Sequence, residues 1–500
     1  MQCECATTTV EVERLIGTGQ LQTRLNAETA TPGAGREVID VLIEQADITI
    51  DSIQPQTDAV VVDGELFCQA VYRQGENTAA RAVTAQTRFS EVVELEGVTP
   101  QSIVKAQGVV EEVTAGYENG RMRFEMSITI RVQAHQLTPI DVITEISGVD
   151  GVQTRFIQVN SCKLAAESNQ AVVVSEEVAL PAQLDARVAL MDWATARVTS
   201  TAPDLGGVKV QGEICSQTLI GTGVSSRPLA MVKVVMPFEQ LVEMPEWLAN
   251  DVTAEASVRR LDAGISPGED DEGAVLRIEG EANIYVRSDH EDAATALEDA
   301  YATGDAQLDV ERENINFAVG KQLIDCSEQF RGTLMLSEDA PGVGVVLATR
   351  ANPVISQWTS ENGITTVEGF LDIKSLYLPS GSEQVTSVRG EMPFSVRCNA
   401  DWPEDAWVNV TAMGCEAAAL MSDRLEIRLT LVITGFYRLT SGATLATKVE
   451  AGEAKAGKSG IVIYWPNDGD DSWTVARRYR LPLSKAPENI KPGTPVVLSV

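Results

Sequence analysis

One strand-like segment occurs three times in the chain and restricts it to a modular, mainly β fold. The copies lie at 61–72, 208–220 and 366–377, and each is an apolar run of period two with an early glycine. A phenylalanine follows each glycine after 25 or 26 residues, in the pairs Gly64 and Phe89, Gly212 and Phe238, and Gly369 and Phe394. Glycine inside a strand indicates a bulge or a close approach where a side chain would not fit. The constant spacing predicts three β modules, each with a structural glycine.

Turn signals separate the remaining runs of alternating residues. The pair Asn119-Gly120 stands between two such runs, and it predicts a hairpin because both residues tolerate positive φ. Residues 289–300 have helical composition, and we expect them to form a short connector. Residues 441–460 are small and polar, which is typical of a flexible linker.

A chain of 500 residues is longer than one hydrophobic core usually supports. We predict three tandem antiparallel modules, β-sandwiches or barrels, followed by a linker and a small α+β module. The predicted units are 1–148, 149–318, 319–440, 441–460 and 461–500.

Charge excludes one large class of partner. The 72 Asp and Glu residues outnumber 39 Lys and Arg, and the net charge is −33. A phosphate backbone would repel such a chain, so we expect no nucleic-acid partner. No stretch of about 18 apolar residues is present, and the first residues do not resemble a signal peptide. We therefore expect a protein that is cytosolic at synthesis, without direct membrane insertion.

The scarcity of residues typical of catalytic sites argues against an enzyme. The chain has two histidines, His135 and His290, and no phosphate-binding glycine loop. Its eight cysteines are scattered, so we expect reduced thiols; only Cys3 and Cys5 are spaced for a metal or a crosslink. We predict no catalytic residues, no cofactor and no metal site.

The last forty residues carry the most specific motif. The strand 461–465 is followed by Gly469-Asp-Asp-Ser-Trp-Thr-Val-Ala-Arg-Arg-Tyr479, and a second strand follows Pro492-Gly493. Either Asp470 or Asp471 can cap a helix here, and Trp473, Val475, Ala476 and Tyr479 supply its packed face. This segment resembles a LysM domain.

The LysM resemblance implies a groove for N-acetylglucosamine polymers, formed by the loop after the first strand and the loop before the last. Pro482 and Pro487 interrupt the short segment before the last strand, so the second helix of the family is expected to be short, distorted or missing. The shortened groove favours protein docking over glycan binding, and both remain open. The residues expected to bind a partner or a glycan are Gly469, Asp470, Asp471, Trp473, Arg477, Tyr479 and Asn489.

The three modules also resemble a known family of domains. The repeated Val-x-Gly-x-(Leu/Ile) pattern and the segment 297–308 look like the tandem SPOCS domains of spore-envelope assembly proteins. SPOCS repeats followed by LysM is the architecture of SipL-type morphogenetic proteins. That resemblance implies a scaffold in the mother-cell cytosol, at the surface of the developing spore. Its implied partners are a coat-basement morphogenetic ATPase and other spore-coat proteins, and the alternative is a protein that binds cortex peptidoglycan.

Overall fold

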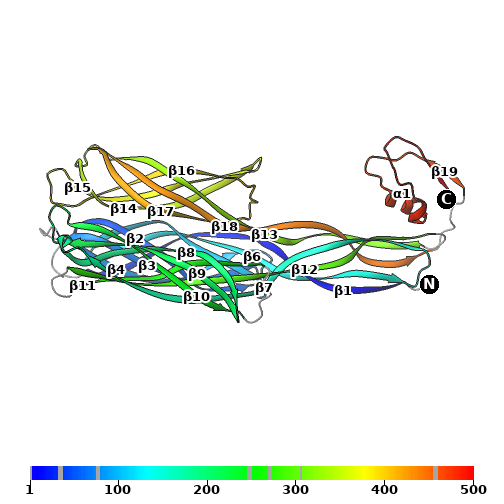
Figure 1. Ribbon diagram of the computed structural model, residues 1–500, viewed down its shortest axis with the longest axis horizontal. Helices are drawn as coiled ribbons and strands as arrows, with labels where there is room; N and C mark the ends of the chain where they lie inside the picture. Colours follow the sequence, from blue (N-terminus) through cyan, green and yellow to red (C-terminus); the bar gives the residue numbers. More distant parts are fainter. Residues whose placement is uncertain are drawn as a thin grey trace.

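The computed structural model shows an elongated molecule (Figure 1). Most strands gather in a broad head, six long strands continue as a narrower stalk, and a small C-terminal module lies at the far end of the stalk, near the N-terminus. The structure describes residues 3–31, 38–74, 79–244, 251–268, 273–303, 307–453 and 460–499, with backbone only at 38 and 39.

The head and stalk consist of three sets of six strands in chain order. The first set is β1 (Glu4–Ala30), β2 (Val38–Gln56), β3 (Ala59–Gln74), β4 (Ala80–Glu94), β5 (Ile103–Glu118) and β6 (Arg121–Ser147). The second is β7 (Val152–Leu180), β8 (Ala186–Asp204), β9 (Gly207–Thr222), β10 (Leu229–Glu243), β11 (Asp251–Pro267) and β12 (Ala274–Ala302), with a 3-10 turn, η1 (Ala182–Leu184). The third is β13 (Gln307–Met335), β14 (Val343–Glu361), β15 (Ile364–Pro379), β16 (Thr386–Cys398), β17 (Trp407–Met421) and β18 (Arg424–Gly452).

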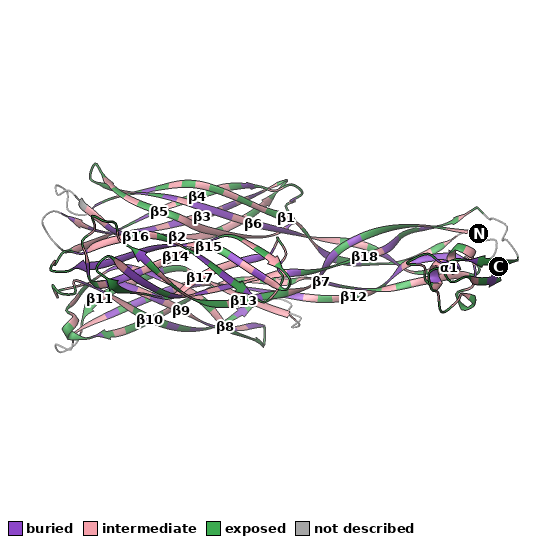
Figure 2. Cartoon of the chain, turned by 90° about the horizontal axis from the view of Figure 1, so that it is seen from above, coloured by how far each residue is buried: buried purple, intermediate pink, exposed green. Residues whose placement is uncertain are grey.

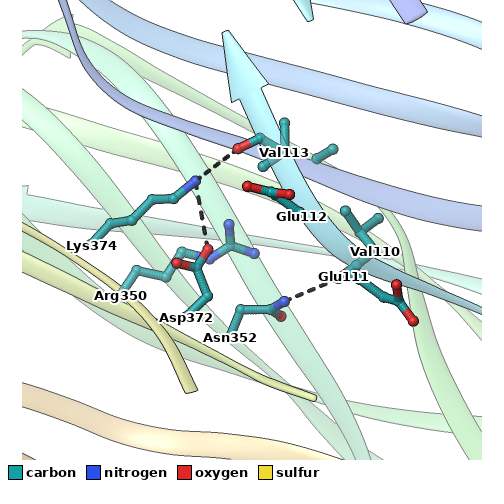
Figure 3. A pocket seen from close by; sticks show the side chains of 9 residues that line it. Val110, Glu111, Glu112, Val113, Arg350, Asn352, Asp372 and Lys374 are labelled. Carbon is teal, nitrogen blue, oxygen red and sulfur yellow. Dashed lines mark hydrogen bonds and ion pairs between the residues drawn. The ribbon is translucent and has the colours of Figure 1, made fainter. Parts of the chain in front are cut away.

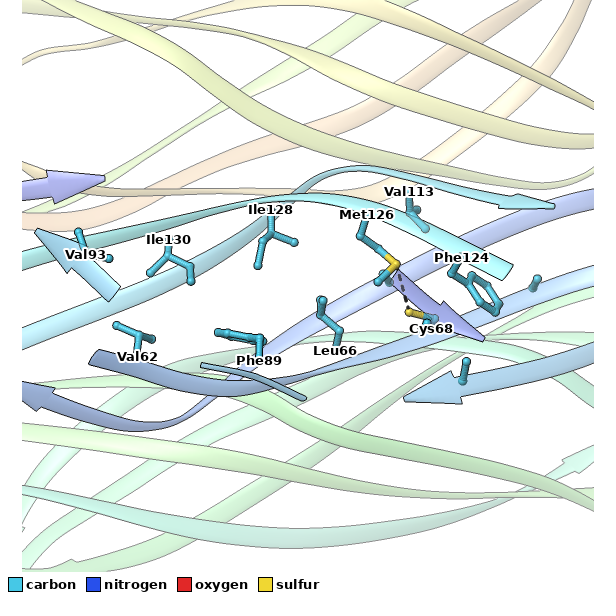
Figure 4. Close-up of a cluster of buried hydrophobic side chains, with 14 of the residues drawn as sticks. Val62, Leu66, Cys68, Phe89, Val93, Val113, Phe124, Met126, Ile128 and Ile130 are labelled. Atoms are coloured by element: carbon cyan, nitrogen blue, oxygen red, sulfur yellow. Dashed lines mark hydrogen bonds between the residues drawn. The ribbon is translucent and has the colours of Figure 1, made fainter. Parts of the chain in front are cut away.

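Each set folds into two antiparallel three-stranded sheets. The sheet orders are β1-β6-β5 and β2-β3-β4, β7-β12-β11 and β10-β9-β8, and β13-β18-β17 and β14-β15-β16. The two sheets of a set enclose an apolar core, which in the first set contains Leu66, Phe89, Phe124 and Ile128 (Figure 4). The prediction of a mainly β fold is confirmed.

The repeated glycines have a direct steric cause. Gly64 pairs across the sheet with Phe89, and a Cβ added to Gly64 would lie 2.4 Å from the Phe89 Cζ and 2.2 Å from the Thr49 carbonyl oxygen. Gly212 and Gly369 meet Phe238 and Phe394 in the same way. Each phenylalanine ring therefore lies over the backbone of the opposite strand, where only glycine leaves room.

The Asn119-Gly120 hairpin is confirmed. Asn119 and Gly120 have φ values of 52° and 82°, and they connect β5 to β6. Positive φ at both central residues matches the twist of the two strands.

Two predicted segments are wrong. Residues 289–300 form no helix but belong to β12, where they pair with β7. Residues 441–452 are no linker but the end of β18, paired with β13, and 454–459 of the predicted linker lie outside the described residues. The third set also begins at Gln307 instead of residue 319. In each case, pairing with a distant strand overrides the local composition.

Apolar side chains from all three sets join the modules. In the head, Leu42, Leu190 and Leu347 share one buried cluster. In the stalk, Val12, Val159 and Phe317 share another. Buried residues thus continue from the head along the stalk (Figure 2), and the three sets form one body.

Candidate functional site

The C-terminal module is built from two short strands and one helix. β19 (Ile461–Tyr464) pairs antiparallel with β20 (Val496–Ser499), and α1 (Ser472–Tyr479) lies between them in the chain. The only further helical element among the described residues of this module is a 3-10 turn, η3 (Leu483–Lys485). This short turn agrees with the expectation that the second helix is short, distorted or missing.

The two aspartates before α1 have different tasks. Asp471 caps the helix, because its Oδ1 accepts a hydrogen bond from the backbone N–H of Thr474 at 2.7 Å. Asp470 accepts from the Tyr464 hydroxyl and from the backbone N–H of Asn467, and these bonds lower the pKa of the Asp470 carboxyl. Gly469 precedes them with a φ of 89°, which favours glycine.

The apolar face of α1 follows the expected pattern. Trp473, Val475 and Ala476 are buried, and Tyr479 is half-buried with its ring in edge-to-face contact with Tyr464 at 5.5 Å. The module thus has a small core of its own.

Two motif residues of α1 also bind the stalk. Trp473 Nε1 and Arg477 Nη1 both donate to the Asp299 Oδ2 of β12, at 2.9 and 2.8 Å. The Tyr301 ring meets the Trp473 ring edge to face at 5.0 Å, and its hydroxyl donates to the Leu481 carbonyl at 2.8 Å. Asp299 is almost fully buried, so these bonds act with little competition from water.

Two residues of β7 also contact the C-terminal module near Asp299. The Arg155 guanidinium lies 5.3 Å from the centre of the Trp473 ring and pairs with Asp471 at 3.2 Å. The backbone N–H of Leu483 donates to Gln153 at 3.0 Å. The structure therefore brings Asp471, Trp473 and Arg477 together against the stalk, whereas Asn489 is exposed and takes no part in these contacts.

The outer face of the β19-β20 sheet is apolar and open. Trp465 is 58% exposed, Ile463 is 55% exposed, and Ile461 and Val497 are exposed further. Ile463 pairs with Val497 across the two strands, so their side chains share one face. We call these four residues the outer face. The sequence indicates this face, because every residue of 461–465 is apolar. Side chains alternate between the two faces of a strand, so both faces of β19 are apolar.

A second polar site lies where the three sets meet at the base of the stalk. It comprises Glu13, His135, Arg287, Asp289, Lys321 and Arg438, which we call the junction network. Arg287 contacts Glu13 at 2.6 Å and Asp289 at 2.8 Å. Arg438 contacts the same two carboxylates at 3.0 and 3.2 Å, and Lys321 reaches Asp289 at 2.8 Å. Sequence reasoning missed this site, because its members come from all three sets.

The junction network holds fixed charges. Burial opposes ionisation of Asp289, but Arg287, Arg438 and Lys321 together lower its pKa to about 2. Burial lowers the pKa of His135 to about 4, although Glu13 lies 3.4 Å from its Nδ1. Asp289 is therefore ionised and His135 neutral near pH 7, which suits a structural role better than proton transfer.

A small cavity lies between the first and third sets (Figure 3). It measures about 20 Å³, and Lys374, Asp372, Arg350 and Asn352 line it from the third set. Lys374 Nζ donates to the Val113 carbonyl at 3.3 Å, and the Asn352 amide donates to the Val110 carbonyl at 3.1 Å. These bonds join two sets across the cavity, and they indicate a contact that holds the modules together.

One cysteine pair corrects the expectation of reduced thiols. Cys326 of β13 and Cys398 of β16 form a disulfide that links the two sheets of the third set. Cys3 and Cys5 are free thiols beside an apolar cluster in the stalk. Within the described ranges, no group of three or more His, Cys, Asp or Glu side chains is arranged to hold a metal ion. No helix in the part of the chain that the structure describes is long and apolar enough to cross a membrane.

Comparison with known proteins identifies one segment. Residues 37–118 match the family model described as SipL, SPOCS domain. The match spans β2 to β5, and so it includes the contact between Gly64 and Phe89. No curated protein and no solved structure matches the chain.

Proposed function

We propose that the chain is a non-enzymatic scaffold in the assembly of the endospore envelope. In this proposal, the C-terminal module binds a coat-basement morphogenetic ATPase in the mother-cell cytosol and so tethers coat material, including other coat proteins, to the developing spore. The match of residues 37–118 to a SipL SPOCS domain supports a role in sporulation. The resemblance of residues 461–500 to LysM supports the choice of binding module.

The main observation behind the proposal is the exposed, apolar outer face. Trp465, Ile461, Ile463 and Val497 expose apolar surface on one side of a sheet whose other side packs on α1. Exposed aromatic and aliphatic residues that share one face mark protein interaction sites. Trp473 and Arg477 are bound to the stalk, whereas the outer face remains exposed and open to a partner.

The stalk gives this face a mechanical role. β12 continues for 13 residues, 290–302, beyond its pairing with β11, and these extend roughly 43 Å at about 3.3 Å per residue. The C-terminal module therefore lies far from most of the head (Figure 1). A scaffold of this shape can bind one partner at the tip while the head contacts another, without steric overlap.

A pull-down from sporulating cells tests the proposal. We expect the full chain to capture the ATPase, and deletion of residues 461–500 to abolish the capture. The substitution Trp465→Ala should weaken it about thirty-fold, since loss of a central aromatic residue costs about 2 kcal/mol. Leu205→Ala is the matched control, because Leu205 is exposed in the head. Capture that survives the deletion would move the contact to the β modules.

The alternative function is binding of cortex peptidoglycan through the loops around Asn489. The full chain should then sediment with purified peptidoglycan, and Asn489→Ala should reduce the bound fraction. Binding through Trp473 would also require release of its bond to Asp299. Sedimentation together with a failed pull-down would overturn the scaffold proposal in favour of this alternative.

A further inference from the structure

A second exposed apolar surface lies on the head, and none of the functions above uses it. Met335 is 59% exposed, Met421 is 57% exposed, and Leu420 and Val345 are about half exposed. They lie where β13 and β17 end and where β14 begins, at the end of the head opposite the stalk (Figure 1). We call these four residues the distal patch.

The strand register brings the members of the distal patch together. Met335 of β13 and Met421 of β17 both pair with Arg424 of β18, so the three side chains share one face of the sheet. The backbone N–H of Val343 donates to the Ser422 carbonyl at 2.8 Å, which joins the start of β14 to the end of β17. The other two members of the patch lie two residues from this bond. The distal patch therefore spans the ends of both sheets of the third set.

Acidic residues surround the distal patch. Backbone hydrogen bonds join the three loops at this end of the third set, 336–342, 380–385 and 422–423. These loops contain no lysine or arginine. Arg424, which lies beside them, is paired with an aspartate at 3.2 Å. The potential around the patch is therefore negative. The exposed acidic residues of the loops are Glu338, Asp339, Glu383 and Asp423.

Charge decides which occupant fits this surface. A second copy of the chain has the same net charge of −33, which opposes self-association. Nucleic acids and anionic membranes are repelled for the same reason. Exposed apolar groups that share one surface mark interaction sites, and methionine side chains adapt to the shape of a partner. The complementary occupant is a protein segment that combines apolar and basic side chains.

We propose that the distal patch binds a basic, amphipathic segment of a partner protein. The apolar side chains of the segment lie on Met335 and Met421, and its lysine or arginine side chains face the acidic loops. This contact goes beyond the proposed function, because it lies on the head and does not involve the ATPase. The molecule then has one binding surface at each end of its long axis (Figure 1).

A binding titration of the full chain with a model peptide tests the proposal. The probe is a short labelled peptide of leucine and lysine, with the leucines on one face of a helix. The control peptide has glutamate in place of each lysine. Fluorescence anisotropy should give a saturating curve for one site with the lysine peptide and no binding of the glutamate peptide. Equal results for the two peptides would contradict the proposal.

Variants on the surface assign the binding to the distal patch. Met421→Ser removes an exposed apolar side chain and should raise Kd about ten-fold. Glu338→Lys combined with Asp339→Lys reverses the charge of one loop and should raise Kd by a similar factor, which shrinks at high salt. Glu94→Lys combined with Glu96→Lys is the control, because it makes the same change in charge at exposed positions at the other end of the head. Equal effects of the two charge reversals would overturn the assignment.

Amide exchange of the unmodified chain locates the contact without any variant. The lysine peptide should slow exchange at 335–345 and 420–424 and leave exchange at 461–465 unchanged. Slower exchange at 461–465 alone would place the peptide on the outer face and overturn the proposal.

The two binding surfaces are separable in the same preparations. Trp465→Ala should weaken capture of the ATPase and leave peptide binding unchanged, and Met421→Ser should do the reverse. A chain that binds the peptide at the distal patch but captures no ATPase would contradict the proposed function and support this inference. Sedimentation equilibrium tests the remaining occupant, since a dimer that Met421→Ser dissociates would assign the patch to a second copy and overturn the inference.

Discussion

The base and the tip of the stalk use similar chemistry for different purposes. At the base, Glu13 and Asp289 are buried among cations from the second and third sets of strands. At the tip, Asp299 is buried against Trp473 and Arg477 of the C-terminal module. In both places, buried carboxylates gather donors from distant parts of the chain.

The difference lies in what each carboxylate holds. The base connects strands that also pair along their whole length, so its loss affects the folding of the body. The tip holds a module of about 40 residues whose apolar cluster includes Tyr301 as its one buried stalk residue, so we expect the module to separate without disturbing the sheets. We infer that the base sets global stability and that the tip sets the position of the binding module.

Glu13→Gln should give the largest effect. It removes the charge that Arg287 and Arg438 share, and breaking a buried ion pair costs about 3–5 kcal/mol. Chemical denaturation measures the loss in free energy of unfolding. Glu11→Gln on the same strand is the control, because Glu11 is exposed and its pair with Lys163 is worth at most about 1 kcal/mol. Equal losses in the two variants would show that the base has no special role.

Acidification should weaken the base through His135. Its pKa falls from 6.5 to about 4 on folding. Between these pH values the unfolded chain binds a proton at His135 that the folded chain does not bind. This contribution to stability is complete above pH 6.5 and is lost as the pH falls to about 4. At about 1.4 kcal/mol per pKa unit, the loss is about 3 kcal/mol. Denaturation between pH 7 and 4 measures it, and His135→Gln should flatten that part of the curve.

Local patterns predicted what depends on local chemistry. The spacing of Gly64 and Phe89 reflects one cross-strand contact, the φ values at Asn119-Gly120 follow from the residue types, and the helix cap at Asp471 needs only three neighbouring residues. Each of these features is determined within one hairpin or one turn. The sequence therefore carries their signal directly.

The features that the sequence did not predict depend on distant partners. Residues 289–300 have helical composition, and only pairing with β7 makes them a strand. Cys326 and Cys398 are separated by 72 residues and have no spacing signature. Arg438 reaches Glu13 across 425 positions. Among 72 acidic residues, nothing local distinguishes the few that become buried.

Asp299→Leu should release the tip and leave the base unchanged. It removes the acceptor for Trp473 Nε1 and Arg477, and charged hydrogen bonds of this kind contribute about 2 kcal/mol. Amide exchange of residues 472–481 should accelerate about thirty-fold, while the free energy of unfolding of the body stays within about 0.5 kcal/mol. Asp292→Leu on the same strand is the control, because the Asp292 side chain is 42% exposed and lies 4.0 Å from its ion-pair partner Lys163. A larger loss in the free energy of unfolding of the body, or unchanged exchange at 472–481, would contradict the division between base and tip.

Tyr301→Phe should give the smallest effect and the sharpest comparison. It removes the 2.8 Å bond to the Leu481 carbonyl and keeps the ring contact with Trp473, so about 1 kcal/mol of docking energy is lost. Exchange at 472–481 should rise about five-fold. Tyr285→Phe is the matched change near the base of the same strand, where Tyr285 donates to Glu167, and it should leave exchange at the tip unchanged. If Tyr285→Phe also accelerates that exchange, β12 couples base and tip, and the C-terminal module then responds to events in the head.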